Sequence, residues 1–309
     1  MSRRVFVAGG HISPFIGKGN PAFIWKKHPD FGVKTNPGLF QYISDATVGA
    51  LASTNTPAKL VDRAFVGNFA GELFNQQGHL GAALAHADSD LMNKPSMRVE
   101  GACASGGLAI AAGRQSILAG DDVVLVVGAE VQSSASARDG GTFLARAADF
   151  HRQSGIDDFT FPALFARRTK AYLEKYTGVS LRDTAQVSVK AYENGNLNPL
   201  AHMHAVKLSL EDAASASKSN PNFLSNEELK DFLRVTDCSQ VSDGGAALVL
   251  VSEEGLKKIG KSPSDAVEIL GLEYGAGDLL SDAEDPTTMA TTKAVVDRLW
   301  ASTGAGVEG

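Results

Sequence analysis

The chain has 309 residues, 43% of them hydrophobic and 21% charged, which is typical of a globular protein of about two domains and not of a disordered one. With 29 lysines and arginines against 35 aspartates and glutamates the net charge is −6, which argues against a nucleic-acid-binding surface and against binding to an anionic membrane. The two cysteines, Cys103 and Cys238, are too few for the disulfide framework of a secreted domain. No apolar run approaches the ~20 residues of a membrane span. We therefore expect a soluble intracellular protein.

Strand-like and helix-like patterns alternate in the first part of the chain. Short apolar or β-branched runs predict strands, and amphipathic segments between them predict helices. The expected strands are 5–8, 64–68, 96–100 and 122–127, and the expected helices are 41–53, 78–87 and 104–119. This alternation predicts an α/β fold in which helices cover a mostly parallel sheet.

From residue 133 to residue 234 the strand-like runs disappear and helix-start signals take their place. Ser180 precedes Asp183 by three residues, and Ser225 precedes Glu228 by the same spacing, which is typical of capping boxes. We expect residues 133–234 to be a mainly helical insertion that includes a helix at 164–176.

The α/β pattern then returns, with expected strands at 246–252 and 266–272 and expected helices at 253–260 and 287–302. The chain stops where the alternation requires another strand. We therefore expect three parts: an N-terminal α/β domain made of residues 1–132 and 235–262, the helical insertion 133–234, and residues 263–309 as the truncated start of a second α/β domain.

The segment Glu100-Gly101-Ala102-Cys103-Ala104-Ser105-Gly106-Gly107 joins an expected strand to an expected helix, which places Cys103 on the connection or the first helical turn. Backbone N–H groups and the helix dipole at such a position favour a thiolate, the reactive form of a cysteine nucleophile. The small neighbours would let a substrate approach the thiol closely. The alternative is a small buried hydrophobic residue, because free cysteines are usually buried.

Other candidate motifs carry weaker signals. The glycines at positions 10, 17 and 19 have the wrong spacing for a phosphate-binding loop and predict a turn. His202 and His204 have no acidic or cysteine partner at ligand spacing, so we expect loop or pocket-rim residues and no metal site. Arg167 and Arg168, on the expected helix 164–176, fit either a solvated face or a cationic rim for a phosphorylated ligand.

A second polar segment, residues 237–247, ends in two glycines before an expected strand. Its side chains Asp237, Ser239, Ser242 and Asp243 fit turn hydrogen bonds, and they fit equally well with ligand contacts at the mouth of a sheet. Both interpretations stay open on these residues alone.

The segments around Cys103 and Ser239 resemble those of thiolases. Residues 99–107, followed after one helix and strand by Val127-Gly128-Ala129-Glu130, are similar to the thiolase nucleophile region. Residues 4–10, 161–167, 196–199 and 237–244 are similar to the sterol-carrier-protein-2 (SCP2) type of thiolase, and the resemblance runs from about residue 4 to residue 272. Ketoacyl synthases share Ala-Cys-Ala but not the other segments, and are the less favoured alternative.

The resemblance implies a layered α/β/α fold and acyl transfer between coenzyme A (CoA) and acyl-CoA, by thiolysis of a 3-ketoacyl-CoA or the reverse Claisen condensation. Cys103 would carry the acyl group as a thioester, and its N–H would help to hold the thioester oxygen. Ser239 would line the pantetheine tunnel, the insertion would cover CoA, and Arg167 or Arg168 would meet the CoA phosphates. CoA and acyl-CoA would be substrates, with no permanently bound cofactor and no metal. The family also implies a homodimer or homotetramer, in a peroxisome-like organelle or mitochondrion of a eukaryote or in bacterial cytoplasm.

The resemblance has one large gap. The sequence contains no His-Cys-Phe or Asn-Glu-Ala-Phe type motif, no Gly-His-Pro motif and no Cys-x-Gly motif, which supply the acid/base groups of thiolases. General acid–base catalysis contributes ~10²–10⁴-fold, so the resemblance implies the reaction class but not turnover by this chain alone. A non-catalytic acyl-CoA-binding or partner-binding protein is therefore the alternative.

Overall fold

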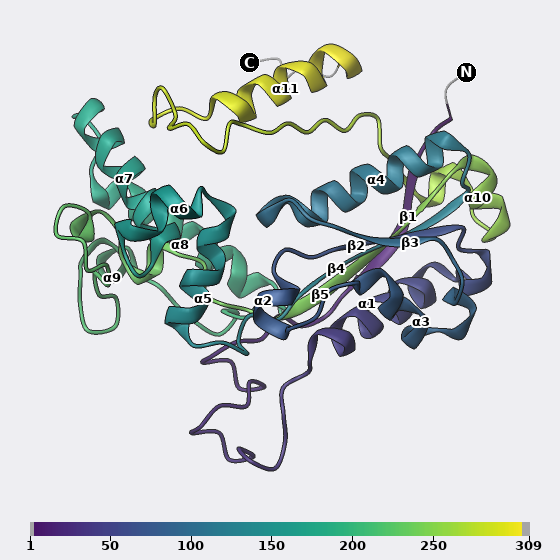
Figure 1. The fold of residues 1–309 in the computed structure, drawn as a ribbon, viewed down its shortest axis with the longest axis horizontal. Helices are drawn as coiled ribbons and strands as arrows, with labels where there is room; N and C mark the ends of the chain where they lie inside the picture. Colours follow the sequence, from purple (N-terminus) through teal and green to yellow (C-terminus); the bar gives the residue numbers. More distant parts are fainter. Residues whose placement is uncertain (1–2, 305–309) are drawn as a thin grey trace.

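The computed structural model describes residues 3–304 and contains a mixed six-stranded sheet with helices on both faces (Figure 1). The strand order is β3-β2-β4-β5-β1-β6. The strands are β1 (Phe6–Ile12), β2 (Arg63–Gly67), β3 (Ser96–Val99), β4 (Val123–Glu130), β5 (Gly244–Val251) and β6 (Val267–Glu268). The helices are α1 (Leu39–Thr54), α2 (Gly71–Asn75), α3 (Leu84–Ala87), α4 (Ser105–Ala119), α5 (Ala137–Leu144), α6 (Phe150–Gln153), α7 (Thr160–Lys175), α8 (Leu181–Leu197), α9 (Leu210–Ala214), α10 (Glu253–Lys258) and α11 (Ala290–Thr303).

The sheet is less parallel than the sequence pattern predicts. β2 pairs in parallel with β3 and β4, whereas β5 runs antiparallel to β4 and β1, and β6 runs antiparallel to β1. The path of the chain explains the difference, because Glu130 at the end of β4 pairs with Gly244 at the start of β5. These two strands form a hairpin whose connection is residues 131–243. The expectation of a mostly parallel sheet is wrong, because β5 begins at the same edge of the sheet at which β4 ends and must therefore run in the opposite direction.

The side chains of β4 alternate between two hydrophobic clusters, one on each face of the sheet. Val123, Leu125 and Val127 pack in the cluster that contains buried residues of α1. Val124 and Val126 pack on the opposite face with residues of α4. Figure 1 shows α4 on one side of the sheet and α1 and α3 on the other. A strand that is buried on both faces has a continuous apolar sequence, which is why the sequence pattern predicted β4.

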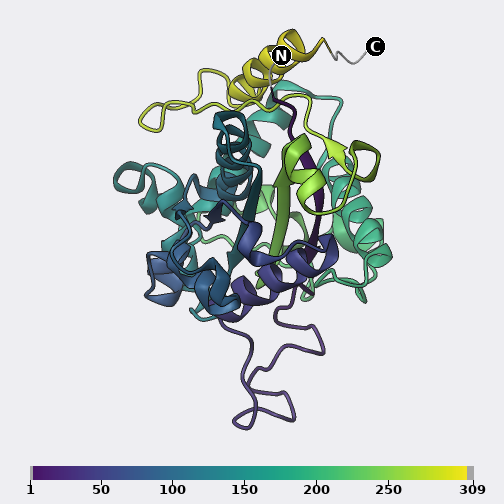
Figure 2. The ribbon, with the colours of Figure 1, turned by 90° about the vertical axis from the view of Figure 1, so that its right-hand side faces the viewer.

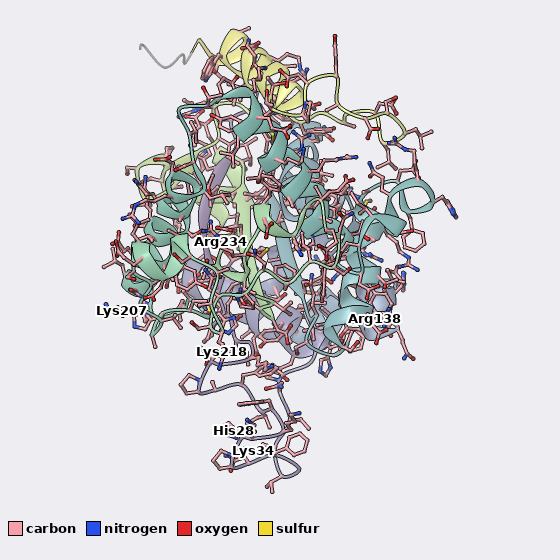
Figure 3. The ribbon with its side chains drawn as sticks, turned by 90° about the vertical axis from the view of Figure 1, so that its left-hand side faces the viewer. His28, Lys34, Arg138, Lys207, Lys218 and Arg234 are labelled. Carbon is pink, nitrogen blue, oxygen red and sulfur yellow. The ribbon has the colours of Figure 1, made fainter. Side chains whose placement is uncertain are left out.

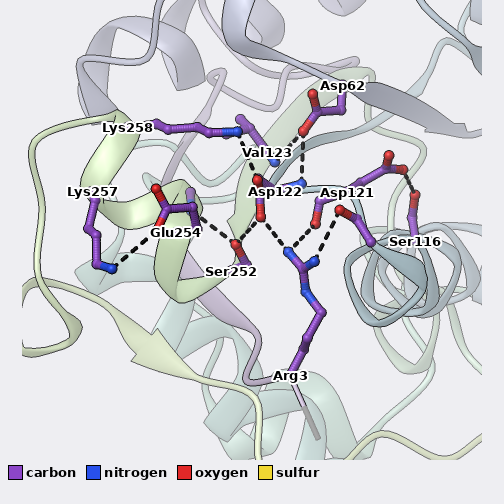
Figure 4. A network of polar contacts seen from close by, with 12 residues as sticks. Arg3, Asp62, Ser116, Asp121, Asp122, Val123, Ser252, Glu254, Lys257 and Lys258 are labelled. Atoms are coloured by element: carbon purple, nitrogen blue, oxygen red, sulfur yellow. Dashed lines mark hydrogen bonds and ion pairs between the residues drawn. The ribbon is translucent and has the colours of Figure 1, made fainter.

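Polar contacts close the sheet edge where β4 begins and β5 ends (Figure 4). The carboxylate of Asp122 accepts hydrogen bonds from Ser252 Oγ at 2.5 Å and Lys258 Nζ at 2.8 Å, and it contacts Arg3. Asp62 Oδ2 accepts from the backbone N–H groups of Asp122 and Val123 at 2.8 and 2.9 Å. These contacts hold together the chain segments at this edge of the sheet.

The connection between β4 and β5 contains α5 to α9. Between residues 133 and 234, all of them described, no strand occurs, as the sequence predicts. Ala163 and Ala166 of α7 pack against Leu224, Leu229 and Leu233 in a hydrophobic cluster separate from the two that cover the sheet. The helical region therefore has a core of its own.

Only one of the two expected capping boxes forms. Asp183 accepts hydrogen bonds from Ser180 N at 2.8 Å and Ser180 Oγ at 2.6 Å at the start of α8, which confirms the first. The second is wrong, because the N–H and hydroxyl of Ser225 donate to Asp157. Asp157 is buried and needs these donors, so a tertiary contact replaces the local cap.

The long connection between β1 and α1 contains a loop that projects away from the body of the protein (Figures 1 and 2). Figure 3 shows His28 and Lys34 on this loop, whereas Arg234 lies within the body. Arg234 is only 3% exposed, and its Nε donates to Asp237 Oδ2 at 3.0 Å. The same guanidinium donates to the carbonyl of Leu181 at 3.2 Å, which ties the start of α8 to the segment that leads into β5.

The last part of the chain departs from the sheet. The expected strand 266–272 forms only as the two-residue β6 on the edge of β1, and the chain then crosses α4 before α11 (Figure 1). The division into residues 1–132 with 235–262, 133–234 and 263–309 stays a prediction, and its outer limits lie beyond the described residues. In residues 3–304 no helix has the length and apolar character to cross a membrane.

Candidate active site

One edge of the sheet collects the segments that the sequence singled out. The carboxyl ends of β1, β2, β3 and β4 lie at this edge, together with the amino end of β5. Cys103 follows β3, and Ser239 and Asp243 precede β5. Residues far apart in sequence are therefore brought to one place by strand direction.

Cys103 lies on a 3₁₀ turn, Ala102–Ala104, that leads directly into α4, and its side chain is exposed. Ala102 before it has φ +50°, a left-handed conformation that costs a non-glycine residue roughly 1–2 kcal/mol. Hydrogen bonds hold this strained turn: Ala102 N–H donates to Glu100 Oε1 at 2.6 Å, and Ser105 Oγ donates to the Ala102 carbonyl at 2.6 Å. Among the described residues no side chain caps α4. The amino end of α4 is thus available to a negatively charged group.

Glycines around the turn set how closely the segments approach. A Cβ at Gly67 would lie 2.7 Å from the Ser105 carbonyl oxygen, and one at Gly101 would lie 2.2 Å from Leu108 Cδ1. The end of β2 therefore touches the start of α4 through a bare backbone. Beside Gly106 and Gly107 the space is open. A ligand could lie along this part of the helix.

Two cavities of about 550 and 540 Å³ lie against the helical region and share a wall. Ser239 and Cys238 line both, together with Leu144, Phe161 and Pro162. The predicted pocket residue Ser239 is therefore placed where two mainly apolar spaces meet. Cys103 lines neither of them, so the structure does not bring the two predicted site residues into contact.

Asp243 is completely buried and fixes the wall of the larger cavity. Its Oδ1 accepts hydrogen bonds from the backbone N–H groups of Gln132 and Ser133 at 2.8 and 3.1 Å, and its Oδ2 accepts from the Ser133 hydroxyl. Gln132 and Ser133 line the cavity. Asp243 thus joins the start of β5 to the segment that follows β4. The sequence left its role open between a turn and a ligand contact, and the structure shows a bond between distant segments.

A second carboxylate, the partly buried Glu130, organises the ends of β2 and β4. Its oxygens accept from Asn68 Nδ2 at 3.0 Å and from Phe69 N at 2.9 Å. Burial raises the pKa of Glu130, although the hydrogen bonds oppose the shift. Arg98 of β3 donates to the carbonyls of Asn68 and Phe69, so this group reaches the strand that precedes the Cys103 turn. Nothing in the sequence reasoning identified this network, since its members come from three strands.

The remaining predicted residues are placed as follows. Burial, with a smaller contribution from Asp237, raises the pKa of Cys238 to about 11. His202 is buried, lines the larger cavity and has its Nδ1 2.7 Å from Ser242 Oγ, which confirms a pocket position. Arg167 and Arg168 line neither cavity. Both contact the segment before α11, at Asp282 and at the carbonyl of Pro286 respectively.

Comparison with known proteins agrees with the fold. The family profile described as "Thiolase, N-terminal domain" matches residues 41–254. An acetyl-CoA acetyltransferase of Methanothermobacter thermautotrophicus is 30% identical over 274 residues, which cover 88% of this chain and 66% of that protein. Sterol carrier protein 2 of Homo sapiens is 29% identical over 292 residues, which cover 92% of this chain and 47% of that protein.

Among solved structures, acetyl-CoA acetyltransferase from Syntrophomonas wolfei superposes with a TM-score of 0.67 at 16% sequence identity. The match covers 100% of this chain and 77% of that one. At this identity the likeness establishes the fold alone. The chain spans about half to two thirds of the length of the two curated relatives.

Proposed function

The chain belongs to the thiolase family, and from that premise we propose that it transfers acyl groups between CoA thioesters, with Cys103 as the nucleophile. The observation that carries the proposal is the Cys103 turn. An exposed thiol stands on a strained, hydrogen-bonded turn at the uncapped amino end of α4, with open space beside it. Such a position exposes the thiol to a substrate and leaves the N–H groups at the start of the helix free to stabilise a developing oxyanion.

In the proposed thiolysis, the Cys103 thiolate attacks the 3-keto carbonyl carbon of a 3-ketoacyl-CoA. The bond between C2 and C3 breaks, its electron pair leaves with acetyl-CoA as an enolate, and a proton from an acid completes that product. A base then takes the proton of a second CoA thiol, and the resulting thiolate attacks the acyl–Cys103 thioester and releases the Cys103 thiolate. The reverse sequence is the Claisen condensation.

The proton transfers in both steps require an acid and a base. The motifs that supply them in thiolases are absent from this sequence. Cys238 is a poor base, because a partly buried thiol whose pKa is raised to about 11 stays protonated at neutral pH. This observation favours a second candidate function, in which the chain binds acyl-CoA without turning it over.

The CoA contacts are proposed from the cavities. Ser239 lies on the wall shared by two cavities whose lining is rich in aromatic residues, which suits the extended pantetheine arm of CoA. We further propose that residues 133–234 act as the domain that covers CoA, that residues 263–309 begin a second α/β domain, and that the chain assembles as a dimer or tetramer. Sedimentation of the purified chain tests the assembly.

The test of the catalytic proposal is acylation of the intact chain. Purified protein is incubated with acetoacetyl-CoA and weighed by mass spectrometry, beside Cys103→Ala and the matched control Cys238→Ala. We expect one acetyl group on the wild type and on Cys238→Ala, and none on Cys103→Ala. An adduct that survives in Cys103→Ala would overturn the assignment. CoA binding without any adduct would support the binding-protein alternative.

A further inference from the structure

The segment between β6 and α11 carries an unusual run of charge. Residues 273–288, the acidic strap, contain five aspartates and glutamates and no lysine, arginine or histidine. Figure 1 shows the chain crossing above α4 and turning back near α7 into α11. Tyr274 Oη, at one end of the strap, accepts a hydrogen bond from Gln115 of α4. The strap therefore spans from the helix that follows Cys103 to the helical region.

At its far end the strap lies against cations of α6 and α7. Asp282 pairs with Arg152 at 2.9 Å and with Arg167 at 3.5 Å. Asp285 pairs with Lys175 at 2.7 Å. This ion pair and the bonds from Thr287 lower the pKa of Asp285 to about 2, so its carboxylate is charged at neutral pH.

Arg168 adds a neutral contact to the same group, because its Nη1 donates to the carbonyls of Pro286 and Thr288 at 2.8 and 3.3 Å. Four cations of one helical surface, Arg152, Arg167, Arg168 and Lys175, are therefore all engaged by the strap. Phosphate groups make the same charge-assisted contacts as these carboxylates, and arginine is well suited to both.

The strap is held mainly by polar contacts. Its large apolar side chains Leu279 and Leu280 are 57% and 70% exposed, so they add little burial against the helices. The charged side chains of these pairs are 38–57% exposed. Each exposed ion pair shifts an equilibrium by only about 1.4- to 5-fold, so a ligand with several phosphate charges can displace the strap.

We propose that the acidic strap is a built-in competitor for the phosphate groups of CoA: its carboxylates occupy the cationic surface of Arg152, Arg167, Arg168 and Lys175, and CoA binds there only when the strap leaves. This inference rests on the proposed function, because it takes CoA as the ligand. It assigns Arg152 and Lys175 to the phosphate site beside the two arginines that the sequence suggested. The strap would then favour ligands that carry the full phosphate charge of CoA.

The test compares CoA with pantetheine, which lacks the phosphates, by calorimetry. The variant is Asp282→Asn/Asp285→Asn, and the matched control is Glu284→Gln, which removes a strap charge that has no ion-pair partner among the described residues. We expect the double variant to bind CoA about 3- to 10-fold more tightly than the wild type. Pantetheine affinity in the double variant, and CoA affinity in the control, should not change.

Hydrogen exchange gives a second measurement on the wild type, in which CoA should speed exchange of the amides of residues 278–288. Unchanged or weaker CoA binding by the double variant, with wild-type CoA binding intact, would overturn the strap inference and leave the proposed function standing. Absence of CoA binding by every protein, while each is folded, would overturn both. Equal gains for CoA and pantetheine would show that the strap blocks access without competing for phosphate, which also overturns the inference.

Discussion

Asp243 offers a sharp test of how the site is held together. Its buried carboxylate accepts two backbone N–H groups, from Gln132 and Ser133, and one hydroxyl. Asp243→Ala leaves both N–H groups without this acceptor, and an unsatisfied buried donor costs about 1–3 kcal/mol. Because the two amides are only partly buried, we expect a loss of about 2–4 kcal/mol in the free energy of unfolding. Asp243→Asn keeps one acceptor oxygen and should lose roughly half as much.

Urea denaturation followed by circular dichroism measures these losses, with Asp90→Ala as the control. Asp90 is exposed and its carboxylate makes no contact among those described, so that change should stay within about 0.5 kcal/mol of the wild type. Acetylation of Cys103 in the folded Asp243→Asn variant should persist, since Cys103 lies on a different connection. A change below about 0.5 kcal/mol for Asp243→Ala would refute the reasoning, because the carboxylate would then not join β5 to the end of β4.

Three further predictions follow from the same edge of the sheet. Iodoacetamide at pH 8 should modify the exposed Cys103 of the folded protein and spare Cys238, whose pKa is raised to about 11. In urea, peptide mapping should find both cysteines modified. Rapid modification of Cys238 in the folded protein would contradict this prediction. Gly67→Ala should lower the free energy of unfolding, measured in urea, by about 1–3 kcal/mol and should slow Cys103 acylation, because the new Cβ would lie 2.7 Å from the Ser105 carbonyl oxygen. The control Gly38→Ala should change neither, because the space beside Gly38 is open. Burial raises the pKa of Glu130, so the folded state holds that proton to higher pH than the unfolded state and loses stability as pH rises from 4.5 through the folded value. The stability of wild type relative to Glu130→Gln should therefore fall across that window, and a rise would disprove the assignment.

The sequence predicted the elements that depend on local pattern. The helix expected at 41–53 forms as Leu39–Thr54, and the strand expected at 122–127 forms as Val123–Glu130. Both are apolar segments whose burial the pattern itself encodes. The helix expected at 78–87 breaks into a 3₁₀ turn, Leu80–Ala83, followed by the short α3, which shows how weakly local pattern fixes a short helix.

Strand direction could not be predicted in the same way, because it depends on where a long connection returns. No local pattern in residues 131–243 predicts that Gly244 will pair with Glu130. The same limit hid the roles of Asp243 and Glu130, whose partners lie on other strands. Cys103 was found because its signal is local, a small-residue segment between a strand and a helix.

The antiparallel return of β5 has a consequence for the site. Had β5 run parallel to β4, the segment before it, with Ser239 and Asp243, would lie at the opposite edge of the sheet from the Cys103 turn. The hairpin instead places that segment beside the end of β4, where Asp243 binds Ser133 and Ser239 lines the cavities. The long helical connection is therefore what allows a ligand held near Ser239 to extend toward the edge that carries Cys103. The two hydrophobic clusters that cover the sheet contain no residue of α5 to α9. Shortening the connection within α5 to α9 should therefore disturb ligand binding before it disturbs the buried strands.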